Sequence, residues 1–206
     1  MKKLGILGKK IAMTQIPNEN RNLIPVTAVW VGENVVSQIK NKEKDGYDSC
    51  QISFEKCKKK INNSKFFHLK KNEISPHKFI KEIKEMNGFK EGDVINSSMF
   101  KEGMKVKVTG ISKGKGTSGV IKRYGFKIGN MSHGAGYPHR LIGSMGGGRG
   151  TNPGIYKGKK MPGRMGNKRN TKISLIKKID ENKEIIFISG SIPGPKKGLI
   201  IIKTYK

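Results

Sequence analysis

The chain has 206 residues, and its 43 Lys and Arg against 15 Asp and Glu give a formal net charge of +28 at pH 7. This excess is larger than solubility requires and favours a polyanionic partner such as nucleic acid. No apolar run reaches the roughly 20 residues of a membrane span, and Gly5 and Gly8 interrupt the segment that resembles an export signal, so we expect a soluble cytoplasmic protein with no membrane partner.

The two cysteines, Cys50 and Cys57, exclude a disulfide-dense secreted fold. Structural zinc sites use four ligands, and no second pair of cysteines completes such a set. We therefore expect two buried or half-buried thiols and no metal or other cofactor.

The first third of the chain has the composition of β-strands. Alternation in 4–16 predicts an opening strand pair, followed by a turn at 17–20 that contains Pro17, Asn18 and Asn20. The β-branched runs 25–31 and 35–39 are separated by three residues, which predicts a hairpin with a short loop. Trp30 lies inside the strand pattern, so we expect it in the core rather than stacked on a base.

The middle of the chain is less regular. A turn at Asp45 and Gly46 precedes a strand predicted for 49–54. Between 61 and 86 two interpretations stay open, because 64–69 fits one or two helical turns and 79–86 fits helical spacing as well as an irregular strand. Strand character returns in 92–100 and in 105–108, where Val and Lys alternate cleanly.

The longest compositional bias begins after Glu102, because the next carboxylate is Asp180. Residues 103–179 hold 18 Lys and Arg, and 16 of the 27 glycines lie in 111–170. Such a segment has few large apolar side chains to bury, and its glycines and like charges oppose ordering. We expect a polyanion to supply the stabilisation that a core gives elsewhere.

Three more β-rich segments follow, at 172–179, 184–189 and 199–203, with a proline-containing loop at 190–198. Strands therefore flank the basic segment on both sides. The chain is predicted to be mainly β, with a small antiparallel β-barrel domain favoured over a sandwich. This domain comprises 1–110 and 171–206, and a long irregular glycine-rich, basic extension, 111–170, is inserted between its strands.

Enzymatic motifs fail on their context. Gly114, Gly116 and Gly119 satisfy G-x-G-x-x-G, but a dinucleotide site needs a following helix and a carboxylate about 20 residues further on. Between this motif and Asp180 the chain has no carboxylate. The Walker A pattern is also absent. His133 and His139 lack further ligands for a metal and are better suited to RNA contact. We expect no catalysis and no small-molecule substrate.

The extension is suited to structured RNA, because glycine backbone approaches phosphates and bases closely and no recognition helix for duplex DNA is evident. Tyr124, Phe126, Tyr137 and Tyr156 either stack on bases or pin the extension to its own domain, and both readings stay open. An out-and-back path through 131–168 reaches up to about 60 Å. The predicted RNA-binding residues are Lys113, Lys115, Lys122, Arg123, Lys127, His133, His139, Arg140, Arg149, Lys157, Lys159, Lys160, Arg164, Lys168 and Arg169.

Five segments together resemble one known family. They are LGILGKKIAMTQI (4–16), VTGISKGKGTSGVIKRYGF (108–126), SHGAGYPHRLIGSMG (132–146), YKGKKMPGRMGN (156–167) and the late PGP (193–195). In this order they resemble the bacterial ribosomal large-subunit protein three family over the whole chain. The resemblance implies a structural constituent of the large ribosomal subunit.

That resemblance further implies direct binding near the 3′ end of the large-subunit rRNA, nucleation of subunit assembly, and contact with large-subunit ribosomal proteins fourteen and nineteen. It implies a basic stem at 112–127 with 156–169, and a tip that approaches the peptidyl transferase centre. Some relatives carry a methylated glutamine at this tip, whereas this chain has no Gln after Gln51. The implied tip residues are Ser144, Met145, Gly146, Gly147, Gly148, Arg149, Gly150, Thr151, Asn152 and Pro153.

A non-ribosomal RNA chaperone or general RNA-binding protein is the alternative function that the composition allows. The two hypotheses differ in their expected behaviour, because a ribosomal constituent co-sediments with the large subunit and a chaperone binds unrelated RNAs equally well.

Overall fold

The computed structural model describes residues 3–18, 21–57, 62–70, 72, 74–84, 86, 88–137, 139–147, 154–166 and 168–205, with the backbone alone at 164 and 165. The chain divides into two compact units. Unit 1 comprises Met1–Ser112 and Arg169–Lys206, and unit 2 comprises Lys113–Lys168. No helix in the described part of the chain is long and apolar enough to cross a membrane.

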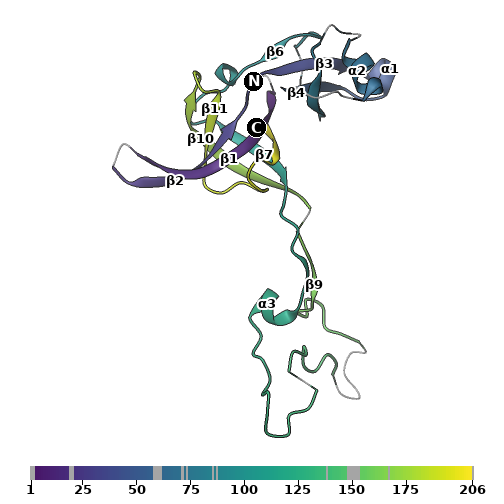
Figure 1. Ribbon diagram of the computed structural model, residues 1–206, viewed down its shortest axis with the longest axis vertical. Helices are drawn as coiled ribbons and strands as arrows, with labels where there is room; N and C mark the ends of the chain where they lie inside the picture. Colours follow the sequence, from purple (N-terminus) through teal and green to yellow (C-terminus); the bar gives the residue numbers. More distant parts are fainter. Residues whose placement is uncertain are drawn as a thin grey trace. The chain divides into compact units, whose positions relative to one another are not determined.

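Unit 1 contains a six-stranded antiparallel sheet that closes into a ring in the order β1-β12-β7-β10-β11-β2, with β2 paired back to β1 (Figure 1). The prediction of a mainly β chain is confirmed. The ring strands are β1 (Gly5–Pro17), β2 (Leu23–Trp30), β7 (Lys105–Ile111), β10 (Arg169–Asp180), β11 (Ile185–Ser189) and β12 (Leu199–Thr204).

Apolar alternation explains how these strands enclose a core. In β7, Val106 and Val108 are fully buried, while Lys105 and Lys107 are exposed, as the sequence predicted. Ile186 and Ile188 in β11, and Ile200 and Ile202 in β12, bury the same alternate positions. The isoleucines and valines of the ring therefore form one continuous apolar interior.

The opening segment is one long strand rather than a strand pair within itself. β1 runs from Gly5 to Pro17 and pairs with β2 across the turn, with a bulge between Lys10 and Ala12. The C-terminal predictions are confirmed apart from Glu184, which lies in the turn before β11. β10, β11 and β12 contain the rest of the three β-rich segments, and the described loop between β11 and β12 contains no strand.

The predicted hairpin between 25–31 and 35–39 is wrong. β2 remains in the ring, whereas β3 (Asn34–Lys40) enters a second sheet of order β5-β4-β3-β6. The intervening Gly32 has φ +48°, and the buried Asn34 side chain accepts from Leu7 N and donates to the carbonyls of Leu7 and Val31. These bonds turn the chain away from β2, so the short loop connects two sheets.

The second sheet resolves the ambiguous middle of the chain. Residues 64–69 lie in helix α2 (Asn63–Lys70), and 79–83 lie in strand β5 (His77–Lys84), while β4 (Ser49–Lys56) confirms the predicted strand. The strand expected over 92–100 is largely wrong, because it shortens to β6 (Val94–Ile95) and a 3-10 turn, η1 (Ser97–Met99). The turn at Asp45 and Gly46 is the end of α1 (Lys42–Asp45), where Gly46 has φ +80°.

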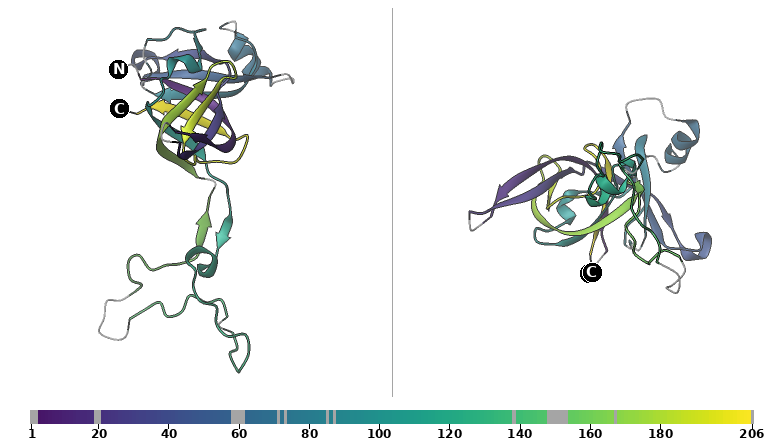
Figure 2. Two further views of the ribbon diagram at one scale, coloured as in Figure 1. Left: turned by 90° about the vertical axis from the view of Figure 1, so that its left-hand side faces the viewer. Right: turned by 90° about the horizontal axis from the view of Figure 1, so that it is seen from below.

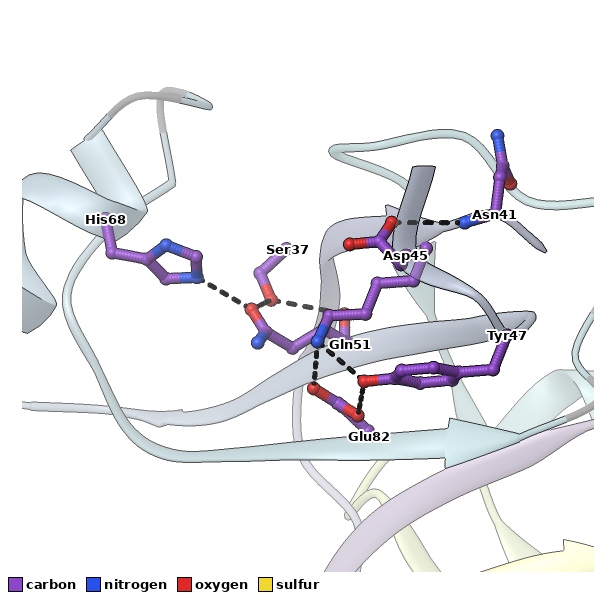
Figure 3. Close-up of polar contacts among 8 residues, drawn as sticks. Ser37, Asn41, Asp45, Tyr47, Gln51, His68 and Glu82 are labelled. Carbon is purple, nitrogen blue, oxygen red and sulfur yellow. Dashed lines mark hydrogen bonds and ion pairs between the residues drawn. The ribbon is translucent and has the colours of Figure 1, made fainter. Parts of the chain in front are cut away.

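Polar contacts tie the helices to this sheet (Figure 3). Gln51 Oε1 accepts from Ser37 Oγ at 2.8 Å and from His68 Nε2 at 2.8 Å, which links β4 to β3 and α2. Glu82 forms an ion pair with Lys40 at 2.7 Å and accepts from Tyr47 Oη at 3.0 Å. Hydrogen bonds from Lys40 and Tyr47 to its carboxylate hold the pKa of Glu82 below its ordinary value.

Trp30 packs against the core with its ring 5.4 Å from that of the buried Phe54, as expected of a core aromatic. Cys50 is buried and Cys57 is half-buried, which confirms the interpretation of both as thiols. Burial raises the pKa of the Cys50 thiol above its ordinary value. The described residues contain no group of three or more His, Cys, Asp or Glu that could hold a metal.

Unit 2 has little regular structure. Its elements are β8 (Gly116–Ser118), α3 (Val120–Tyr124) and β9 (Gly163–Met165), and β8 and β9 run antiparallel as a two-stranded ladder (Figure 2). The described residues between α3 and β9 form turns, bends and irregular backbone, without a further helix or strand.

Candidate nucleic-acid interface

The two ends of unit 2 are joined by the β8–β9 pair. Gly116 lies opposite Met165, Thr117 opposite Arg164, and Ser118 opposite Gly163. Immediately beyond the ladder, Gly166 has φ +89°, and a Cβ there would lie 1.8 Å from the carbonyl oxygen of Lys113. The close backbone approach that joins the two arms therefore requires glycine at 166.

Helix α3 is a single short turn between two glycines. It begins after Gly119 and ends at Gly125, whose φ of +72° is the left-handed conformation that terminates helices. Val120 is 2% exposed and Ser118 is 4% exposed, so these two side chains anchor the turn. With five residues, α3 is far shorter than the helix of a dinucleotide fold, in agreement with the rejection of the G-x-G-x-x-G reading.

One aromatic of unit 2 contacts its own cations. The guanidinium of Arg123 lies 4.9 Å from the centroid of the Tyr124 ring, and Lys160 Nζ lies 5.7 Å from it. Arg123 Nη1 also donates to the carbonyl of Met161 at 2.7 Å. This cluster joins α3 to the returning arm, so Tyr124 contributes to contacts within unit 2, and nothing among the described residues attaches it to unit 1.

Tyr137 is different, because it is 91% exposed. Its backbone carbonyl accepts from His139 N, and His139 in turn donates from Nδ1 to the carbonyl of Asn130 at 2.6 Å. His139 thus closes a local loop, and the Tyr137 ring projects to solvent. This exposure favours the stacking role at this position.

The predicted basic residues are for the most part exposed. Lys159 and His139 are half-buried, and Lys159 Nζ donates to the carbonyl of Ser144 at 2.9 Å, which ties the stem to the start of the predicted tip. Arg149 lies outside the described residues, as do Gly148, Gly150, Thr151, Asn152 and Pro153 of the tip, and nothing describes the side chain of Arg164. The exposed members are Lys113, Lys115, Lys122, Arg123, Lys127, His133, Arg140, Lys157, Lys160, Lys168 and Arg169.

The charges of unit 2 have no internal carboxylate to pair with, since residues 103–179 contain no Asp or Glu. The ion pairs Lys9–Glu55, Lys40–Glu82 and Lys56–Glu33 lie in unit 1. Unit 2 therefore presents an unbalanced positive surface on a backbone of turns, without the carboxylates used for acid–base chemistry.

The sequence did not single out two positions that shape this surface. Gly166 permits the approach of the two arms, and a Cβ at Gly163 would lie 2.5 Å from Arg123 Nη1. In the sequence, glycines adjoin Lys157, Lys159 and Arg164 of the returning arm. The sequence does not show what Gly163 and Gly166 approach in space, because those contacts join residues that are distant along the chain.

Comparison with known proteins gives a consistent result. A family model described as ribosomal protein L3 matches residues 73–184. The chain is 45% identical over 207 residues to large ribosomal subunit protein uL3 of Alkaliphilus metalliredigens, covering 97% of this chain and 96% of that protein. It is 42% identical over 205 residues to the protein of the same name from Streptomyces coelicolor, covering 97% and 95%, and 46% identical over 202 residues to that of Mycoplasma capricolum, covering 97% and 89%.

Proposed function

Because the chain belongs to the family of large ribosomal subunit protein uL3, and so is a structural constituent of the large subunit rather than an enzyme, we propose that unit 2 is its main contact with large-subunit rRNA. The observation that carries the proposal is the acid-free, exposed positive surface of unit 2 on a glycine-rich backbone. Phosphates neutralise such a surface, and main-chain N–H groups supply further donors to them.

The two parts of the chain differ in composition, and we assign them different roles. We assign residues 1–110 and 171–206 to a small β-barrel domain and 111–170 to an RNA-binding extension. The stem, 112–127 with 156–169, carries most of the cations, whereas Ser144–Pro153 is a tip of small residues suited to close approach. The cations of the stem determine the affinity for rRNA by binding its phosphates. The tip contributes close contacts with the RNA that surrounds it.

Family membership also motivates the finer parts of the proposal. The chain binds near the 3′ end of the large-subunit rRNA, nucleates assembly, and directs its tip towards the peptidyl transferase centre. It contacts large-subunit ribosomal proteins fourteen and nineteen. Direct binding to RNA ahead of other proteins is consistent with a net charge of +28, because long-range attraction accelerates encounter with a polyanion.

The experiment removes stem charge. K157Q/K159Q/K160Q is compared with K101Q/K178Q/K183Q, a variant with the same charge loss at exposed lysines of unit 1. Affinity for large-subunit rRNA is measured over a range of salt concentrations. The stem variant is expected to lose roughly tenfold or more, with the slope of log K against log salt reduced by about 2–3. Equal losses in the two variants would contradict a specific role for the stem.

A sedimentation experiment separates this function from a general RNA chaperone. The parent chain is expected in large-subunit particles, and the stem variant is expected to be depleted from them relative to the unit 1 control. Equal affinity for unrelated RNAs, together with absence from the particles, would support the chaperone instead.

A further inference from the structure

A hairpin arm extends from the ring where β1 and β2 leave their other neighbours (Figure 1, Figure 2). The register of β1 with β12 ends at Lys9, and that of β2 with β11 covers Val26–Trp30. Beyond these points β1 and β2 stay paired with each other, out to Pro17 opposite Leu23. We call residues 11–18 and 22–25 the arm.

The arm contains no charged residue. Neither 11–18 nor 22–25 includes Asp, Glu, Lys or Arg, although charged residues make up 28% of the chain. Between these two segments the sequence has one acid and one base, Glu19 and Arg21. Surfaces that bind RNA neutralise phosphates with Lys and Arg, whereas the centres of protein–protein interfaces are depleted of charge. The composition of the arm therefore favours a protein partner over rRNA.

One edge of β1 lacks a strand partner in the arm. Lys10 N donates to the carbonyl of Gly198, and beyond this bond no described strand pairs with that edge. The edge from 11 to 17 is roughly 20 Å long, and a strand edge presents unpaired N–H and C=O groups. Proteins commonly protect such edges with charged side chains, prolines or bulges. Here the bulge before Ala12 and Pro17 lie at the two ends, and 12–16 has none of these devices.

Apolar side chains line a shallow recess beside this edge. Met13, Gln15 and Pro17 share one face of β1, where Gln15 lies opposite Pro25 and Pro17 opposite Leu23. Met13 is 50% exposed and Leu23 is 63% exposed. The recess has a volume of about 560 Å³ and is lined by Met13, Thr14, Gln15, Leu23 and Pro25. It has room for the apolar side chains of a strand added next to β1.

We propose that the arm docks an extended, uncharged segment of another large-subunit protein, which adds as a strand to the edge of β1 between Ile11 and Ile16. Main-chain hydrogen bonds supply the affinity of such a contact, and the recess selects apolar side chains at alternate positions. The proposal rests on membership of the large subunit, which the family establishes. It is independent of the RNA contact proposed for unit 2.

Amide exchange of the parent chain tests the added strand. The edge-facing amides of 11–16 are expected to exchange rapidly in the free protein and in its complex with large-subunit rRNA alone. In the complete large subunit they are expected to exchange about tenfold or more slowly, while β12 provides the protected reference in all three states. Protection by rRNA alone, protection in the concentrated free protein, or rapid exchange in the complete subunit each overturns the proposal.

A photocrosslink identifies the partner. p-Benzoylphenylalanine replaces Met13 of the full chain, and the same group in place of Met99, 39% exposed in η1, is the control. In reconstituted large subunits the probe at position 13 is expected to crosslink to an uncharged, extended segment of a large-subunit protein that the probe at position 99 does not reach. A crosslink to rRNA, a crosslink to a second copy of this chain, or no crosslink would contradict strand addition.

An added charge separates a protein partner from RNA by the sign of its effect. Met13→Lys places a charge against an uncharged strand, so roughly tenfold less of this variant than of the parent is expected in complete subunits when the two compete during reconstitution. Its affinity for free rRNA is expected to stay within about twofold of the parent. If the arm contacts rRNA instead, the new cation should raise that affinity and increase the salt slope by about 1.

Met99→Lys makes the same change at an exposed methionine outside the arm and is expected to compete equally with the parent. Thermal unfolding verifies that both variants are folded. The proposals for the arm and for unit 2 fail separately. If K157Q/K159Q/K160Q retains its affinity for rRNA, only the stem assignment is wrong. If Met13→Lys competes as well as Met99→Lys, the arm proposal is wrong whatever the stem variant does.

Discussion

Units 1 and 2 are ordered by different means. Unit 1 buries a continuous apolar cluster that includes Leu7, Phe54 and Ile202, and it balances part of its charge with ion pairs. Among the described residues of unit 2, Val120 is the one buried apolar side chain. The other contacts that hold this unit together include close backbone approaches at glycines and contacts between cations and aromatic rings. The difference indicates that unit 1 folds on hydrophobic burial, and we expect unit 2 to need a partner to complete its stabilisation.

The largest expected effect comes from the core of unit 1. Ile202→Ala removes a fully buried side chain from β12 and is expected to lower the free energy of unfolding by about 2–5 kcal/mol. Urea denaturation of the free protein measures it. Ile173→Ala, at a position 49% exposed in β10, is the control and should change stability by about 0.5 kcal/mol or less. Similar losses at both positions would show that burial does not control the stability of unit 1.

A smaller effect is expected from the close approach in unit 2. Gly166→Ala forces a strained φ and a clash with the carbonyl of Lys113, which should destabilise the β8–β9 pair by about 1–3 kcal/mol. Amide exchange at Gly116–Ser118 should accelerate, while exchange in β12 stays unchanged. Gly136→Ala is the matched control, because a Cβ there meets nothing within 4 Å. Unchanged exchange in Gly166→Ala would mean that the ladder does not depend on this glycine.

The aromatics of unit 2 sharpen the comparison further. Tyr137→Ala is expected to weaken binding to large-subunit rRNA by about 1–2 kcal/mol without changing amide exchange in β8, since the ring has little contact with its own chain. Tyr124→Ala is expected to accelerate exchange in α3 instead, because it loses contacts with Arg123 and Lys160. Measurements of RNA affinity and of amide exchange on both variants distinguish base stacking from a structural role within unit 2. Full affinity in Tyr137→Ala would exclude stacking by that residue.

The smallest effect concerns pH and unit 1. His77 is fully buried, and its Nε2 has no hydrogen-bond partner among the described groups, so burial lowers the pKa of this imidazole below its ordinary value of 6.5. The unfolded chain therefore takes up a proton first. The stability contribution is fully present above about pH 6.5 and is lost as the pH falls from there towards the folded-state pKa.

Urea titrations across this window should show a slope from this one group of at most about 1.4 kcal/mol per pH unit. His77→Gln should remove that slope, and His68→Gln, at an exposed histidine of α2, should retain it. An unchanged slope in His77→Gln would assign the pH dependence to other groups.

The local sequence pattern predicted where strands lie better than it predicted which strands pair with each other. Alternation located β7 and its buried valines, and β-branched composition located β2, β3 and β4. The false hairpin between β2 and β3 arose because a three-residue gap is compatible with either a turn or a transfer between sheets. What decides is the buried Asn34 side chain, which bonds to Leu7 in a different strand. Single-sequence periodicity contains no information on that contact.

For the candidate interface too, the sequence predicted the segment but not the contacts within it. Composition alone identifies the basic segment, and the sequence predicts the exposed lysines of unit 2 as RNA-binding residues. Contacts within it, such as Arg123 with Met161, required the arms to be placed together.

By itself the sequence determined the absence of carboxylates between Glu102 and Asp180, so no pairing of strands can give that segment internal ion pairs. It also determined which strand positions face a core, because side chains alternate with a period of two. Only the tertiary structure decided that the six strands close into a ring, that Lys107 lies opposite Lys203, and that Ile83 covers Gly5. Register between distant strands depends on the packing of the whole unit, and that packing sets which charges become neighbours.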